Sequence, residues 1–175
     1  MNRFSIIAGI FTILSITSLS QQKGEGNQIT PKLTDEEIEK LFADPLPKDA
    51  YHLTLNCDTA FPDAIYIPSD IYDAIKELDK MLTPEFKAYF RSTPMDRLFE
   101  FHFGIGLWMR NYWGLWANSR LYKYFESMGL FHPDDISSTI LQCYWRHLNG
   151  AELCLQELVS YYQEYWQNYR EEVSY

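Results

Sequence analysis

The chain has 175 residues and a formal net charge of −9. This length suits one domain with a sizeable hydrophobic core. The acidic balance disfavours binding to nucleic acid and to anionic membrane surfaces, which need clustered Lys and Arg. This negative charge favours a cation-rich partner, or it serves only to keep the protein soluble.

The first twenty residues, MNRFSIIAGIFTILSITSLS, predict a secretory signal peptide. Arg3 supplies a positive start, an apolar run follows, and Ser18-Leu19-Ser20 offers small residues at a cleavage site. The apolar run has about 16 residues, short of the roughly 20 that a membrane-spanning helix needs, which favours cleavage over an uncleaved anchor. We therefore expect an exported protein, periplasmic or extracellular, with no membrane span after cleavage.

The mature chain is expected to begin with a flexible, polar and Gly-containing lead-in at 21–33. A single domain then covers 34–175. Thr34-Asp35-Glu36-Glu37 is a capping-box pattern and predicts a short helix that ends near Phe42.

An extended or β segment is expected at about 51–67. The stretch YHLTLNC at 51–57 alternates apolar and polar side chains, as a half-buried strand does. Residues 64–67 offer a second short strand, so a small hairpin or an extended arm is predicted.

From Ser69 onward the signals are helical. Ser69 predicts a cap, and Thr83-Pro84 and Thr93-Pro94 each combine a capping hydroxyl with proline at the first helical position. His132-Pro133-Asp134-Asp135 opens a later helix with two carboxylates in its first turn. We expect helices over 69–82, from 84, and over 94–112, 117–128, 133–148 and 151–172. The predicted fold class is mainly α, a small helical domain with a long C-terminal helix.

The predicted helix at 94–112 is apolar nearly all round, which is typical of a buried central helix. Gly104 and Gly106 lower its helix propensity. Glycines at such positions indicate the close approach of another backbone or of a ligand.

The stretch GLWMRNYWGLWANSRL, residues 106–121, is dense in Trp and Arg. Aromatic residues at helical spacing usually form core, so we favour packing over a binding platform. Buried Arg110 would need a carboxylate partner. The candidates are Glu100, Asp134 and Asp135, and we favour an ion-pair network that ties the 94–112 helix to the start of the 133–148 helix.

The alternative is catalysis, with Glu100, His102, Asp134 and Asp135 as the candidate acids and bases. Two carboxylates across a cleft walled by Trp would suit glycan cleavage, but no spacing in the sequence shows such a pair. No nucleophile motif, phosphate loop or cofactor motif is present, so we predict no cofactor.

The cysteines are Cys57, Cys143 and Cys154. An oxidising compartment permits disulfides, but an odd number leaves one thiol unpaired. Cys143 and Cys154 flank the Asn149-Gly150 turn, and their pairing is possible although out of register for a helical hairpin. No spacing resembles a metal site, and none is predicted.

The C-terminal helix carries an aromatic stripe. Its members are Leu158, Tyr161, Tyr162, Tyr165, Trp166 and Tyr169. The stripe is interpreted as the face that docks on the domain, with an exposed partner or carbohydrate surface as the alternative.

The strings FHFGIGLWMRNYWGLWANSRLYKYF, GLFHPDDISSTIL and YWRHLNG resemble a bacterial domain family of unknown function. The resemblance covers about 65–150 and implies a small helical domain with no assigned activity and no known site residues. The positions that match the family's pattern are Arg110, Asn111, Trp113, Trp116, Ser119, Arg120, His132, Asp134 and Asp135.

We therefore predict a non-catalytic binding or interaction module. A hydrolase acting on envelope glycan or peptide, using Glu100 with Asp134 or Asp135, is the alternative, and an immunity-type protein that binds a toxin is a second. The sequence does not identify the partner, which could be a protein or an envelope glycan. The candidate binding residues are Arg110, Asn111, Trp113, Trp116, Ser119, Arg120, His132, Tyr161, Tyr165 and Trp166.

Overall fold

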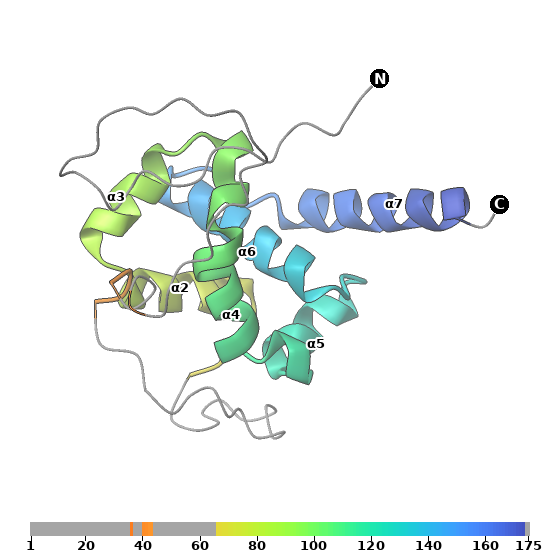
Figure 1. The fold of residues 1–175 in the computed structure, drawn as a ribbon, viewed down its shortest axis with the longest axis horizontal. Coiled ribbons are helices and arrows are strands. Elements are labelled where there is room, and N and C mark those ends of the chain that lie inside the picture. Colours follow the sequence, from red (N-terminus) through yellow and green to blue (C-terminus); the bar gives the residue numbers. More distant parts are fainter. Residues whose placement is uncertain (1–35, 37–39, 44–65, 174–175) are drawn as a thin grey trace, which may run out of the picture.

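The computed structural model describes residues 36, 40–43 and 66–173, and this part of the chain is mainly helical (Figure 1). The α-helices are α2 (Ile71–Met81), α3 (Pro84–Ser92), α4 (Leu107–Tyr112), α5 (Arg120–Ser127), α6 (Pro133–Leu148) and α7 (Leu155–Val173). Two 3-10 helices, η2 (Met95–Phe101) and η4 (Leu115–Ala117), and a π-helical stretch, η3 (His102–Gly106), complete the order. The mainly α fold class and the long C-terminal helix are confirmed.

The signal peptide, the lead-in and nearly all of the 51–67 segment lie outside the described residues, so these predictions stay predictions. Within the described ranges no residue lies in a strand. One antiparallel bridge joins Phe42 to Leu82. No helix in these ranges has both the length and the apolar character to cross a membrane.

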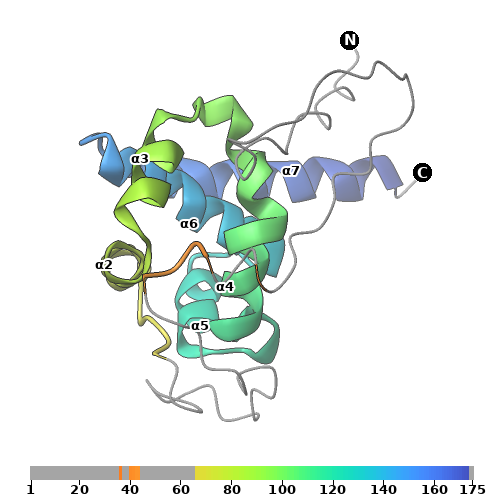
Figure 2. The same ribbon diagram turned by 60° about the vertical axis from the view of Figure 1, so that its left-hand side comes forward.

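Helix α6 is the centre of the fold, and every other helix of the described chain contacts it (Figures 1 and 2). Its buried side chains include Ile136, Ile140 and Tyr144. Around it, one hydrophobic core joins α2, α3, the 95–117 segment and α5. The sequence predicted a central helix at 94–112 instead, because that stretch is apolar nearly all round.

The 94–112 prediction is wrong in detail, because this segment is η2, η3 and α4 in succession. The break lies at Gly104, whose φ of −95° and ψ of −107° are not helical. Thr93 does not N-cap the next helix; it is the C-cap residue of α3, and its hydroxyl donates to the Tyr89 carbonyl at 3.0 Å. A Cβ on Gly106 would lie 3.2 Å from the Phe101 carbonyl oxygen and 3.3 Å from Nη1 of Arg110, so the predicted close approach is to the chain itself.

The other helix starts follow the predicted capping chemistry with one shift. Thr83 accepts a backbone N–H bond from Phe86, as predicted. Ser119, which was not predicted as a cap, accepts one from Tyr122 at the start of α5. Asp70, not Ser69, caps α2 by accepting from the Asp73 N–H at 2.9 Å.

Cys143 and Cys154 are free thiols, so the disulfide between them, left open by the sequence, does not form in this structure. The Cys143 Sγ donates to the Leu153 carbonyl at 3.7 Å, and the Cys154 Sγ accepts from Arg146 at 3.3 Å. Burial raises the pKa of the Cys143 thiol to about 12, which makes it unreactive at neutral pH. Cys57 lies outside the described residues.

Candidate binding groove and the buried arginine network

Arg110 is the centre of a buried polar network. Its guanidinium is 3% exposed and lies on α4, facing the start of α6. Nε is 2.9 Å from Oδ1 of Asp134, Nη1 donates to Ser137 Oγ at 2.9 Å, and Nη2 donates to the His102 carbonyl at 3.1 Å. The predicted ion pair between this segment and the start of the 133–148 helix is therefore present, with Asp134 as the partner.

His102 borders this network. Its Nε2 lies 3.6 Å from Oδ1 of Asp134 and 3.5 Å from Nη2 of Arg110. Burial and the positive charge of Arg110 lower the pKa of His102, and the attraction of Asp134 offsets only part of that decrease. The imidazole is thus held neutral in the fold at pH values where it would be protonated in the unfolded chain.

This pKa shift predicts a loss of stability in mild acid. Between the folded pKa of His102 and its ordinary value of 6.5, the unfolded chain binds more protons, so the free energy of unfolding decreases as the pH falls through that window. His102→Gln should remove this slope, and His147→Gln, which leaves His102 in place, should keep it. Urea titrations from about pH 7.5 to about pH 5 measure the slopes. Parallel profiles for wild type and His102→Gln would refute the assignment.

Glu100 is separate from this network. It is buried on η2, and its carboxylate bonds the Nε and Nη2 groups of Arg97. Because the Glu100 carboxylate is paired with the Arg97 guanidinium, it is suited to a structural role. In the described ranges no group of three or more His, Cys, Asp and Glu side chains has the geometry to hold a metal ion.

Asp135 has a different partner, the side chain of Trp166 on α7. Its Oδ2 accepts the indole N–H of Trp166 at 2.7 Å. Burial raises the pKa of Asp135, and the Trp166 hydrogen bond opposes that increase. The Trp166 ring also stacks on His132 with centroids 5.8 Å apart and an interplanar angle of 29°. These two contacts fix the orientation of Trp166.

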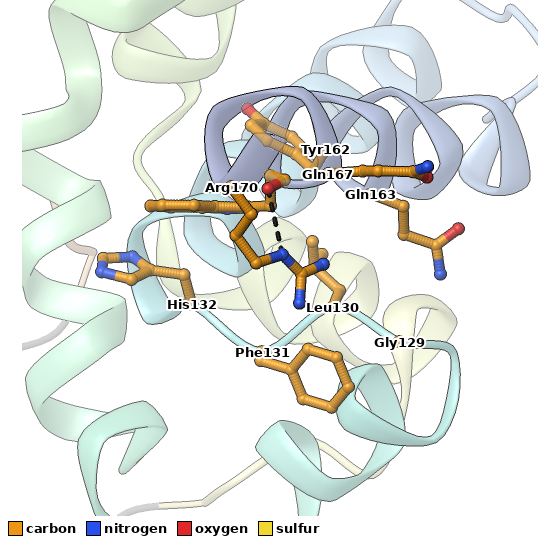
Figure 3. A pocket seen from close by; sticks show the side chains of 9 residues that line it. Gly129, Leu130, Phe131, His132, Tyr162, Gln163, Gln167 and Arg170 are labelled. Carbon is orange, nitrogen blue, oxygen red and sulfur yellow. Dashed lines mark hydrogen bonds between the residues drawn. The ribbon is translucent and has the colours of Figure 1, made fainter. Parts of the chain in front are cut away.

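A groove of about 620 Å³ opens beside Trp166, between α7 and the connection from α5 to α6 (Figure 3). Phe131 lies on the connection with 61% of its surface exposed. From α7, Arg170 extends toward the connection, and its Nε donates to the Trp166 carbonyl at 3.2 Å (Figure 3). The lining residues are Gly129, Leu130, Phe131, His132, Tyr162, Gln163, Trp166, Gln167 and Arg170. We call this site the aromatic groove.

Gln163 sets the spacing between the two walls of the aromatic groove. Its Nε2 donates to the Met128 carbonyl at 2.8 Å across the gap. The φ of Gly129 is +83°, a conformation that favours glycine, and a Cβ there would also press on that same Nε2. A direct hydrogen bond thus joins the two walls of the groove.

Trp116 extends the aromatic surface beyond the groove. It is 57% exposed, and its ring lies edge to face with His132, with ring centroids 6.0 Å apart and an interplanar angle of 82°. His132 also caps α6, since its Nδ1 accepts the Asp134 N–H at 3.3 Å. One histidine therefore joins two tryptophans that are 50 residues apart in the sequence.

The remaining candidates lie elsewhere. Trp113 is completely buried, Asn111 is exposed on α4, and Ser119 is a buried helix cap. Arg120 donates to the Ile67 carbonyl at 2.7 Å and lies 5.1 Å from the centroid of the Tyr66 ring. These contacts tie α5 to the segment before α2.

Residues 67–148 match the family model "Domain of unknown function (DUF6794)". The DUF6794 match therefore contains Arg110, Asp134 and the α5–α6 connection, but it ends before α7. The aromatic groove forms between the DUF6794 region and a helix outside it. No curated protein and no solved structure matches the chain.

Of the groove residues, His132 and Trp166 could be predicted from the sequence as binding candidates, whereas Phe131, Gln163, Gln167 and Arg170 were not predicted. A signal for the amides exists, because Gln163 and Gln167 are one helical turn apart beside Tyr162 and Trp166. Phe131 lies in a loop and has no periodicity to mark it.

Proposed function

We propose that the protein is a non-catalytic binding module and that the aromatic groove binds a saccharide. The observation that carries this proposal is the fixed orientation of Trp166 at the groove, held by Asp135 and stacked on His132. An aromatic ring that is already immobilised binds a flat apolar surface without losing further side-chain entropy.

The chemistry of the groove supports a sugar ring as the ligand. The faces of Trp166 and Phe131 suit the apolar C–H face of a pyranose. The amides of Gln163 and Gln167 and the guanidinium of Arg170 suit its hydroxyl groups. This combination of mostly apolar walls and a few polar groups is typical of small-ligand sites.

The contacts of the carboxylates favour binding over hydrolysis. Glu100 is paired with Arg97, Asp134 with Arg110, and Asp135 with the Trp166 indole. Hydrolysis of a glycoside needs two carboxyl groups that face one substrate. The contacts of these three carboxylates support structural and positioning roles.

The predicted signal peptide supports an exported protein that meets glycans outside the cytoplasm. We expect the protein recovered from expressing cells to lack residues 1–20 and to begin at Gln21. Intact-mass measurement checks this. A mass that retains all 175 residues would contradict export by cleavage.

Titration calorimetry against linear oligosaccharides of glucose and of N-acetylglucosamine tests the proposal. A ligand at 100 times its Kd would also raise the free energy of unfolding by about 2.7 kcal/mol. Trp166→Ala should abolish binding. Phe131→Ala should weaken it without affecting the fold, because Phe131 is exposed, and Tyr72→Ala on α2 is the matched control for an exposed aromatic residue. Equal binding by wild type and both groove variants would refute the proposal.

A further inference from the structure

The backbone turns Trp116 out of the domain. It lies on η4 between Gly114 and Asn118, whose φ values of 61° and 53° are both in the left-handed region. Its two neighbours are anchored, since Leu115 is buried and Ala117 packs against the core. The Ala117 N–H also donates to the Gly114 carbonyl at 2.9 Å. A hydrogen-bonded turn with anchored sides therefore sets the exposure of Trp116.

This turn carries two costs. A left-handed φ is uncommon for residues other than glycine, and Asn118 adopts one. Residues held in such conformations cluster at binding and active sites, where the surrounding structure enforces them. An indole left in water also forgoes the apolar burial that stabilises a fold. Both costs point to a ligand for Trp116.

Trp116 is continuous with the aromatic groove through His132. The His132 ring contacts Trp116 edge to face and stacks on Trp166, with ring centroids 6.0 Å and 5.8 Å apart. His132 lines the groove and lies at one end of it (Figure 3). Single exposed aromatic residues are ordinary, whereas contiguous ones mark ligand sites. Trp116 therefore extends the aromatic lining past the end of the groove.

Polar groups lie at this junction as well. The side chain of Asp134 is 37% exposed, and its Oδ2 lies 3.7 Å from Nδ1 of His132, while its Oδ1 pairs with Arg110. Asn118 is exposed two residues after Trp116. A carboxylate accepts from sugar hydroxyl groups, and an amide both donates to them and accepts from them. The junction thus offers the same mixture of aromatic and polar groups as the groove.

The exposed tyrosines of α7 are arranged differently. Tyr161 and Tyr165 are 60% and 52% exposed, and they contact Tyr162 and Trp166 of the same helix with ring centroids 5.3 Å and 5.4 Å apart. Neither tyrosine lines the groove. Of the stripe predicted on this helix, Leu158 and Tyr162 pack against the core, as expected for a docking face. The aromatic surface therefore continues from the groove toward η4.

We propose that Trp116 is a second binding platform and that the ligand is an oligosaccharide chain running from the aromatic groove across His132 to η4. This inference rests on the saccharide proposal and adds a contact residue and a requirement for chain length. A chain held in the groove presents its next sugar units to Trp116 at a high effective concentration. Affinity therefore rises with chain length until both tryptophans are covered.

Calorimetric titration of the protein with oligosaccharides of graded length tests this inference. The probes are linear oligosaccharides of glucose and of N-acetylglucosamine, from the disaccharide to the hexasaccharide. In the series that binds, the affinity of wild type should rise by at least about tenfold from the shortest chain to the longest. Trp116→Ala should abolish this rise. It should leave disaccharide binding within about twofold of wild type, because the groove itself is unchanged.

Two further variants are controls. Trp116→Tyr keeps an aromatic ring and should retain part of the rise, and Tyr72→Ala removes an exposed ring on α2 and should retain all of it. Equal affinity of wild type for every chain length would overturn the inference, as would an equal loss at every length in Trp116→Ala. Both results leave the saccharide proposal standing, whereas no binding of any oligosaccharide would overturn both.

Discussion

Replacing Arg110 by Ala should lower the free energy of unfolding by about 3 kcal/mol, the low end of the range for breaking a buried ion pair. The substitution leaves Ser137 Oγ and the His102 carbonyl without the donor they share. It also leaves the Asp134 carboxylate without its nearest cation. The loss falls at the low end because the side chain of Asp134 is 37% exposed and can recover water.

Urea unfolding followed by circular dichroism measures this loss. Arg91→Ala, at an exposed position on α3, should change the free energy by less than about 0.5 kcal/mol. The double variant Arg110→Met/Asp134→Leu should recover part of the stability, because replacing both partners removes the unpaired charge. An unchanged unfolding midpoint for Arg110→Ala would show that the network does not support the fold.

The two tryptophans of the WGLW stretch should respond in opposite ways to truncation. Trp113 is 0% exposed and meets Trp108 edge to face at 5.6 Å, so Trp113→Ala should cost about 3–5 kcal/mol. Trp116 is 57% exposed, so Trp116→Ala should cost less than about 0.5 kcal/mol. The two substitutions delete the same side chain three residues apart, and each is the control for the other.

Thermal unfolding of both variants checks this prediction. A Trp113→Ala protein with the midpoint of wild type would contradict the burial of that ring. A strongly destabilised Trp116→Ala protein would show that the contact between Trp116 and His132 stabilises the fold even though Trp116 is exposed.

These tryptophans also show why the sequence could predict part of the site and not the rest. Both fit the aromatic, helical pattern of the 106–121 stretch. The chain breaks its helix after Tyr112 and turns through Gly114, which has a φ of +61°. That turn sends Trp113 inward and Trp116 outward. Periodicity assumes one continuous helix and cannot assign faces across a turn.

Predictions that depended on local chemistry succeeded best. Thr83 caps α3, Pro84 and Pro133 begin their helices, and the start of α6 carries its two carboxylates. Such signals act over a few residues and need no tertiary information. The partner of Arg110 was narrowed to three carboxylates, and the structure selects Asp134 because α4 lies against the start of α6.

The aromatic groove could not be predicted from the sequence, because its two walls come from segments that are far apart in the chain. The α5–α6 connection and α7 meet only through tertiary contacts such as Gln163 to the Met128 carbonyl and Trp166 to Asp135. Trp166 and His132 were each plausible candidates in isolation. Their stacking, which makes the surface continuous, depends on how α7 crosses the domain.

The most direct test of the saccharide-binding proposal is an NMR titration of the isotopically labelled protein with the oligosaccharide that binds most tightly. We expect shifts in the Trp166 indole N–H and in the backbone amides of 129–132, with little change at Tyr161 and Tyr165. Shifts confined to Tyr161 and Tyr165, or none at saturating concentrations of every sugar tested, would contradict a saccharide site in the aromatic groove.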